Sequence, residues 1–166
     1  MLIPLGLALL LVGAGIADPP PLIEAAKGGD WEAVGVLLEQ GADVTVTAAD
    51  GATALHWASY WDDVETAQLL IRAGADVSAA NDLGATPLWI ASLNGSTSMT
   101  QTLLEAGANP NAALLSGESP VMTAARTGSP QVVEGLLAAG ADPNASATRG
   151  QTALMWAASQ LHSNVV

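Results

Sequence analysis

A pattern with a constant interval of 33 residues runs through most of this chain. A Gly-Ala pair recurs at this interval and begins at Gly41, Gly74, Gly107 and Gly140. A second series of glycines keeps the same spacing, at Gly51, Gly84, Gly117 and Gly150. A period held this strictly indicates stacked copies of one structural unit, each too small to bury its apolar face alone.

Each unit is predicted to form two short helices. The first begins at a hydroxyl residue two positions after the second glycine, and these residues are Thr53, Thr86, Ser119 and Thr152. We expect their side chains to cap the helix, and Pro87 and Pro120 suit the first helical position, where no N–H is needed. Apolar residues follow at a spacing of three, which predicts one buried face. These residues are Leu55, Ala58, Leu88, Ala91, Val121, Ala124, Leu154 and Ala157.

The second helix of each unit carries an apolar stripe and ends at the Gly-Ala pair. The stripe is predicted to be buried and consists of Val34, Leu37, Leu38, Ala67, Leu70, Ile71, Thr100, Leu103, Leu104, Val133, Leu136 and Leu137. The glycine suits the left-handed conformation that ends a helix. Short polar side chains two residues later should bond back to the turn, and they are Asp43, Asp76, Asn109 and Asp142.

The segments ATALHWA (52–58) and ATPLWIA (85–91), together with the Gly-Ala-Asp stops, resemble ankyrin repeats. The resemblance covers residues 19–166 and implies an all-α solenoid of four repeats and a truncated fifth. The boundaries fall near 18–49, 50–81, 82–114, 115–147 and 148–166. The first unit departs from the pattern at Asp18 and Pro20-Pro21, as terminal repeats commonly do. In the second unit, Asp62 replaces the inter-helix glycine, which leaves the shape of that turn open.

The first seventeen residues differ from the rest. Met1 to Ala17 carries no charged side chain, and its apolar run ends in small residues before a cluster of prolines. This pattern resembles a cleaved signal peptide (1–17) and predicts export to the periplasm or the extracellular space. An uncleaved membrane anchor and a buried structural helix are the alternatives, although the apolar run is short for a bilayer span.

Charge and motif content exclude several classes of function. Sixteen acidic residues against four basic ones give a net charge of −12, which disfavours nucleic acid as a partner. The chain has no cysteine, so it has no disulfide or thiolate chemistry. It also carries no phosphate-binding loop, nucleophile elbow or zinc-protease motif. We therefore expect no cofactor, no metal and no catalytic activity.

Three features that suggest chemistry have ordinary structural interpretations. The resemblance implies that the His56 ring bonds to nearby backbone and steadies the turns. The acidic group Asp62, Asp63 and Glu65 lacks the spacing of a calcium loop and is typical of a solvated helix start. The triplets at Asn94 and Asn144 match the glycosylation pattern but also read as turn residues.

The resemblance places the partner-binding surface on the turn tips and on the residues after the alanines of each first helix. The residues predicted to contact a partner are Tyr60, Trp61, Leu93, Asn94, Arg126, Asp82 and Leu83. Exposed Tyr, Trp and Arg are the residues that most often carry binding energy at interfaces. Tyr60 and Trp61 have a competing interpretation, in which they only pack over the turn at Asp62. Trp57, Trp89 and Trp156 are predicted to pack mainly between repeats.

These observations predict a monomeric, exported scaffold that binds another protein in a preorganised groove. Two alternatives belong to other classes. The chain could be the non-catalytic part of a longer enzyme whose catalytic domain lies beyond Val166, or a membrane-tethered scaffold held by residues 1–17.

Overall fold

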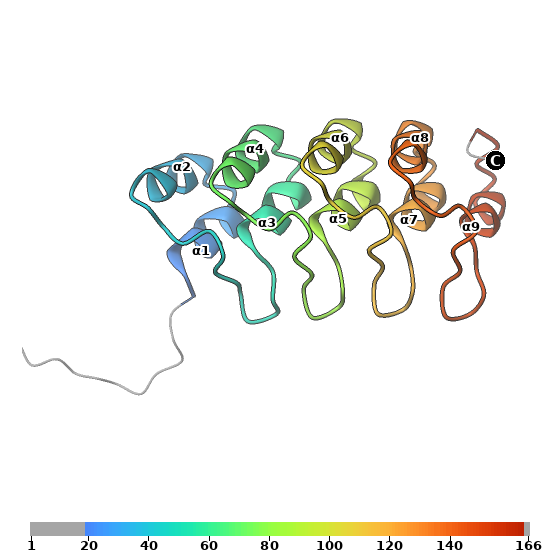
Figure 1. Ribbon diagram of the computed structural model, residues 1–166, viewed down its shortest axis with the longest axis horizontal. Coiled ribbons are helices and arrows are strands. Elements are labelled where there is room, and N and C mark those ends of the chain that lie inside the picture. Colours follow the sequence, from blue (N-terminus) through green and yellow to red (C-terminus); the bar gives the residue numbers. More distant parts are fainter. Residues whose placement is uncertain (1–18, 165–166) are drawn as a thin grey trace, which may run out of the picture.

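The computed structural model describes residues 19–164, so the predicted signal peptide lies outside the described residues. Within this range the chain forms pairs of short helices stacked in a row (Figure 1). The helices are α1 (Pro21–Gly28), α2 (Trp31–Glu39), α3 (Ala54–Tyr60), α4 (Val64–Arg72), α5 (Pro87–Asn94), α6 (Thr97–Glu105), α7 (Pro120–Thr127), α8 (Pro130–Ala138) and α9 (Ala153–Ser159).

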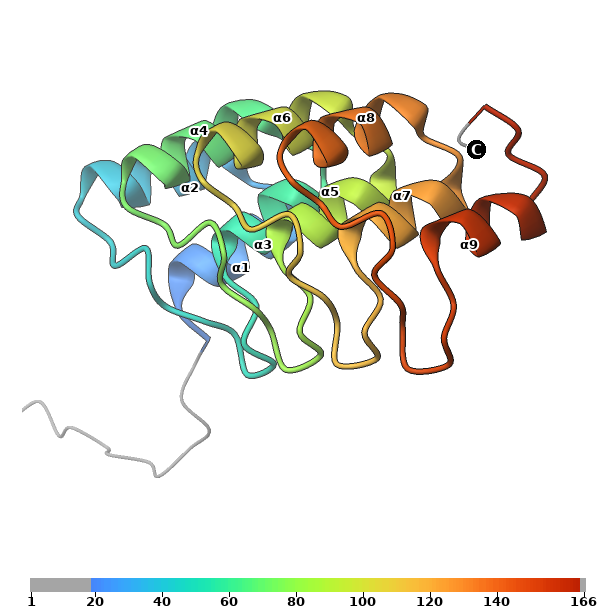
Figure 2. The same cartoon turned by 45° about the vertical axis from the view of Figure 1, so that its right-hand side comes forward.

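The helices form two layers. The odd-numbered helices make one row, which we call the inner row, and the even-numbered helices make the outer row beside it (Figure 2). Each helix packs against its partner in the same unit and against the equivalent helix of the next unit. The loops between units project away from both rows, on the side of the inner row (Figure 1). The predicted all-α solenoid of four helix pairs and an incomplete fifth is confirmed.

The predicted caps are confirmed for Thr86 and Thr152, whose hydroxyls accept the N–H groups of Trp89 and Met155. At Thr53 the cap is a capping box, in which the Thr53 side chain receives the His56 backbone N–H and the Thr53 backbone N–H donates to a ring nitrogen of His56. The prediction for Ser119 is wrong, because its buried hydroxyl makes no hydrogen bond to any described residue.

The core runs along the stack between the two rows. Leu55, Leu88 and Val121 occupy equivalent positions and are at most 2% exposed, as the spacing predicts. The prediction for Leu154 is wrong, because this side chain is 57% exposed. No described helix pair follows α9 to cover it. Along the second helices the last stripe position is only half-buried, and Leu137 is exposed for the same reason as Leu154.

The turn between the two helices of each unit has the same geometry throughout the stack. Its left-handed residue is Gly29, Asp62, Gly95, Gly128 or Leu161. In every unit the next residue donates its N–H to a carbonyl five residues earlier, for example from Asp63 to Ala58 at 2.9 Å. Asp62 has a φ of 58° and keeps this bond, so the turn of the second unit matches the others.

The projecting loops are tight turns that bond to one another. Within a loop the chain closes on itself, as where the Ala48 N–H donates to the Ala52 carbonyl at 2.8 Å. Between loops a single backbone bond joins each tip to the next. These bonds run from Asp82 to Asp50, from Leu115 to Leu83 and from Thr148 to Ser116, at 2.9–3.0 Å. The polar residues after each Gly-Ala pair accept the N–H two positions later, as predicted.

Candidate functional site

The candidate site is the surface where the loop tips meet the inner row, which we call the recognition groove. Its side chains come from the loops and from the ends of α3, α5, α7 and α9. The structure leaves most of the predicted contact residues accessible in this region. Tyr60, Trp61 and Leu83 are 56%, 52% and 68% exposed; Leu93, Asn94 and Asp82 are also exposed, and Arg126 is half-buried.

Three aromatic rings gather at the end of α3. The ring centroids of Trp57 and Tyr60 lie 5.9 Å apart at an interplanar angle of 77°, and those of Tyr60 and Trp61 lie 5.3 Å apart at 83°. Both contacts are edge-to-face, the arrangement that the charge distribution of aromatic rings favours. Tyr60 is held by a ring on each side, although its hydroxyl bonds to no described residue.

Trp61 also joins the second unit to the first. Its indole N–H donates to the carbonyl of Lys27 at 3.3 Å, and its ring lies close to Gly29. The ring therefore lies over the inter-helix turn of the first unit, whereas the alternative interpretation of the sequence placed it over the turn at Asp62. This contact gives Trp61 a structural role besides any contact with a partner.

Asn94 makes a comparable link from the third unit to the second. Its side-chain amide donates to the carbonyls of Ser59 and Tyr60, each at 3.0 Å. These carbonyls belong to the last turn of α3, and the Ser59 carbonyl also accepts the Asp62 N–H at 3.3 Å. Asn94 thereby fixes the backbone that carries Tyr60. Its predicted contact with a partner stays a prediction.

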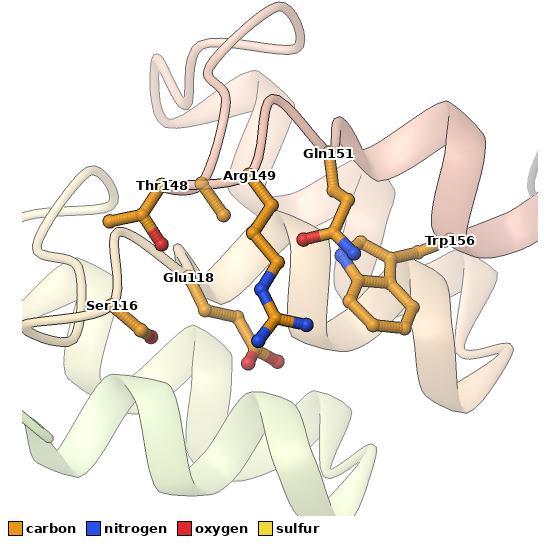
Figure 3. A pocket seen from close by; sticks show the side chains of 7 residues that line it. Ser116, Glu118, Thr148, Arg149, Gln151 and Trp156 are labelled. Atoms are coloured by element: carbon orange, nitrogen blue, oxygen red, sulfur yellow. The ribbon is translucent and has the colours of Figure 1, made fainter.

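Arg126 takes part in a network at the other end of the groove. Its guanidinium donates to the Glu118 carboxylate at 3.0 Å and lies over the Trp156 ring, 5.8 Å from the ring centroid. The Thr123 hydroxyl donates to the same carboxylate oxygen. Beside this network is a hollow of about 290 Å³, which Arg149, Gln151 and Trp156 line from the last loop and α9 (Figure 3).

His56 is a buried structural histidine. Its Nδ1 accepts the Thr53 backbone N–H at 3.1 Å, and its Nε2 is 2.9 Å from the Ala85 carbonyl of the next unit. A carbonyl only accepts, so we assign the proton to Nε2 and a neutral ring. Burial lowers the pKa of His56, against smaller raising effects from the Ala85 bond and the Asp50 charge. The backbone role that the resemblance implied is confirmed.

The remaining tryptophans of the inner row are half-buried. Trp57 and Trp156 pack against the core, in agreement with the prediction of packing between repeats. Along residues 19–164, the buried indole N–H groups of Trp57, Trp89 and Trp156 have no acceptor. Buried donors normally find partners, so these three make the inner row less fully bonded than the rest of the core.

The acidic group of the second unit serves the start of a helix. The Asp63 carboxylate accepts the Thr66 N–H at 2.7 Å and caps α4. In the part of the chain that the structure describes, no three acidic or histidine side chains converge as metal ligands would. Over the same part, none of the helices has the length and apolarity needed to cross a bilayer.

Several groove contacts have no local signal in the sequence. The bonds from Trp61 to Lys27 and from Asn94 to Tyr60 each join residues 34 apart, one unit plus one residue. The pairing of Glu118 with Arg126 joins a loop to the end of a helix. For the contacts of Trp61 and Asn94 the only available signal is the period itself, which places the bonded residues on neighbouring units.

A row of helix pairs, with loops that project beside one layer, defines a helical repeat solenoid. The family model for ankyrin repeats matches the chain in overlapping stretches over residues 6–81, 22–114, 65–147 and 113–166. The chain belongs to the ankyrin-repeat family. Proteins built from these repeats are generally non-catalytic modules that bind other proteins. The search of curated proteins found no match to the chain.

Proposed function

We propose that this protein is an exported, monomeric scaffold that binds another protein in its recognition groove and catalyses no reaction itself. The observation that carries the proposal is the exposure of large side chains on rigid elements of the groove. Tyr60 and Trp61 are both more than half exposed, yet neighbouring rings and a backbone bond fix their positions. Exposed aromatic residues that are already ordered lose little entropy on binding.

The outer row offers a weaker case for binding. Its large exposed apolar residues are Val36 on α2, Leu69 on α4 and Leu137 on α8, and none of them is aromatic. Single exposed apolar residues are normal on a soluble protein. The groove instead combines apolar, aromatic and charged side chains along one surface, which is the composition of protein interfaces.

The test is a crosslinking capture of partners by the intact protein and by two variants. The groove variant is Tyr60→Ala, because Trp61 also holds two units together. The matched control is the double variant Val36→Ala and Leu69→Ala, which removes exposed apolar surface from the outer row. All three proteins are first shown to have equal helicity by circular dichroism.

We expect one set of captured proteins to be common to wild type and control and absent or strongly reduced with Tyr60→Ala. Loss of the same proteins from the control alone would place the functional surface on the outer row. Identical sets from all three proteins would remove Tyr60 from the binding surface.

The proposal of export rests on the sequence of Met1 to Ala17, which resembles a cleaved signal peptide. N-terminal sequencing of the protein made in its own cells tests it, and a mature chain that begins at Asp18 is the expected result. A chain that keeps residues 1–17 and remains with the membrane fraction would support the tethered alternative. Light scattering of the purified protein tests the monomeric state.

A further inference from the structure

A second hollow in the recognition groove lies between the second and third units. Its volume is about 190 Å³, and its lining includes Asp50, Trp57, Tyr60, Asn81 and Ile90. It is smaller than the hollow beside Trp156, and its size suits one long side chain rather than a whole ligand. Two of its walls are aromatic, and an acidic residue stands at its rim.

The charge around this hollow is acidic. Asp50 is exposed, and its charge reaches the interior far enough to act on His56. The Asp82 N–H donates to the Asp50 carbonyl, so a second exposed acidic residue lies on the adjacent loop tip. Across residues 19–164, the single salt bridge is that of Arg126 with Glu118, and Asp50 and Asp82 take part in none.

The junction between the fourth and fifth units shows what a hollow at this place can hold. It lies two periods, or 66 residues, after the junction between the second and third units, and Trp156 there occupies the position of Ile90. There the guanidinium of Arg126 covers the Trp156 ring and pairs with the Glu118 carboxylate. A cation over an indole ring beside a carboxylate is a stable arrangement, and the chain supplies all three groups itself.

The hollow between the second and third units has no Lys or Arg among the described residues that line it. The position of Arg126 is taken there by Tyr60, whose ring stands against Trp57, and the position of Glu118 by Ala52. The acidic residue at the rim is Asp50, in the position that Ser116 has at the hollow beside Trp156.

We propose that the hollow between the second and third units receives an arginine side chain of the partner, whose guanidinium packs on the Trp57 and Tyr60 rings and faces the Asp50 carboxylate. This inference rests on the proposed function and specifies the chemistry of the partner. A planar guanidinium stacks on aromatic rings and pairs with carboxylates better than a compact ammonium does. The net charge of −12 favours the approach of a basic segment.

The test uses a defined peptide, acetyl-Gly-Ala-Arg-Ala-Gly-amide, titrated into the ¹⁵N-labelled protein. The five tryptophans give five indole N–H signals, which Trp→Phe variants assign. We expect a saturable shift of the Trp57 signal and little change at Trp31 on the outer row. The same peptide with citrulline, which is neutral and similar in shape, should produce no such shift, and a lysine peptide a weaker one.

Two variants separate local charge from net charge. Asp50→Asn removes the rim charge but keeps an oxygen to accept the Ala52 N–H. Asp76→Asn is the matched control, because Asp76 is also exposed and accepts the N–H two residues later, from Ser78. We expect Asp50→Asn to weaken peptide binding about two- to fivefold, the usual range for an exposed charge pair. Asp76→Asn should leave it unchanged.

Any of three results would overturn the inference. They are equal shifts with the citrulline and arginine peptides, equal weakening by Asp50→Asn and Asp76→Asn, and no saturable shift of the Trp57 signal. If the partner capture still depends on Tyr60 in that case, the proposed function stands and only the arginine assignment falls.

Discussion

A single buried imidazole connects two units of this solenoid. His56 accepts a bond from the start of its own helix and donates one to Ala85 in the next unit. Only the bond from Thr53 requires the neutral ring, since a protonated Nδ1 has no lone pair with which to accept, whereas Nε2–H donates to the Ala85 carbonyl in either state. Protonation of His56 therefore acts on the start of α3.

We expect stability to depend on pH through His56. Burial lowers its pKa in the folded protein, so the unfolded chain binds more protons as the pH falls below the ordinary value of about 6.5. The free energy of unfolding should therefore be fully present above that pH and fall as the pH drops toward the folded pKa. Urea unfolding followed by circular dichroism between pH 5 and 7.5 measures this slope.

The variant His56→Gln should lose about 1–3 kcal/mol at pH 7.5, because a buried junction loses its bonds. It should also lose the slope between pH 5 and 6.5. His162→Gln, which removes the other histidine of the chain, is the control and should keep the slope that His56 produces. An unchanged slope in His56→Gln would show that the carboxylates, rather than His56, cause the acid sensitivity.

At the scale of the element, the turn between the two helices imposes the same backbone conformation on every unit. The left-handed residue at this turn is glycine in three units and Asp62 or Leu161 in the other two. The cost of a substitution at this residue differs between units, because atoms of the neighbouring unit lie closer to some of these turns than to others.

Gly29 and Gly95 form a matched pair for testing this crowding. Their φ angles are 71° and 68°, so alanine carries a similar backbone penalty at both, of about 1–2 kcal/mol. A Cβ at Gly95 would lie 2.5 Å from the Ser129 hydroxyl, whereas at Gly29 the nearest atom is 4.0 Å away. We expect Gly95→Ala to destabilise the protein more than Gly29→Ala in urea unfolding. Gly95→Ala with Ser129→Ala should recover the difference, and equal losses in the two single variants would refute the role of crowding.

The helices could be predicted from the sequence because each depends on residues close together in the chain. Thr86 and Pro87 mark a helix start in any context, and the Gly-Ala pairs mark the ends. Ser119 has the same local signal as Thr86, yet its hydroxyl makes no cap, so the residue type alone does not decide that bond. The contacts of Trp61 and Asn94 depend on how neighbouring units are offset, and the sequence of one unit does not encode that offset.

At the scale of the whole molecule, burial depends on position along the stack. Leu88 and Leu154 are equivalent in sequence, but Leu88 lies between two neighbours and is fully buried, while Leu154 is 57% exposed. A repeat solenoid is stabilised by nearest-neighbour contacts, so the same substitution has different costs in different units.

We expect Leu88→Ala to reduce the free energy of unfolding by about 2–5 kcal/mol, as in other well-packed cores. Leu154→Ala should cost less than about 1 kcal/mol, because its side chain is mostly exposed already. Urea unfolding of the 166-residue chain measures both. Comparable losses would mean that α9 is covered in solution, for example by a second copy of the protein.

The backbone bonds between successive loop tips relate the spacing of the units to the spacing of side chains along a bound peptide. Each tip is tied to the next by one backbone bond between residues 32 apart, and the tips follow the helix-to-helix spacing of about 10 Å. A peptide in the polyproline II conformation rises about 3.1 Å per residue with three residues per turn, so a partner segment of that form lying along the tips would present every third side chain to successive units. For a partner of that form, the loop tips would set a period of three residues, with one peptide side chain at each tip.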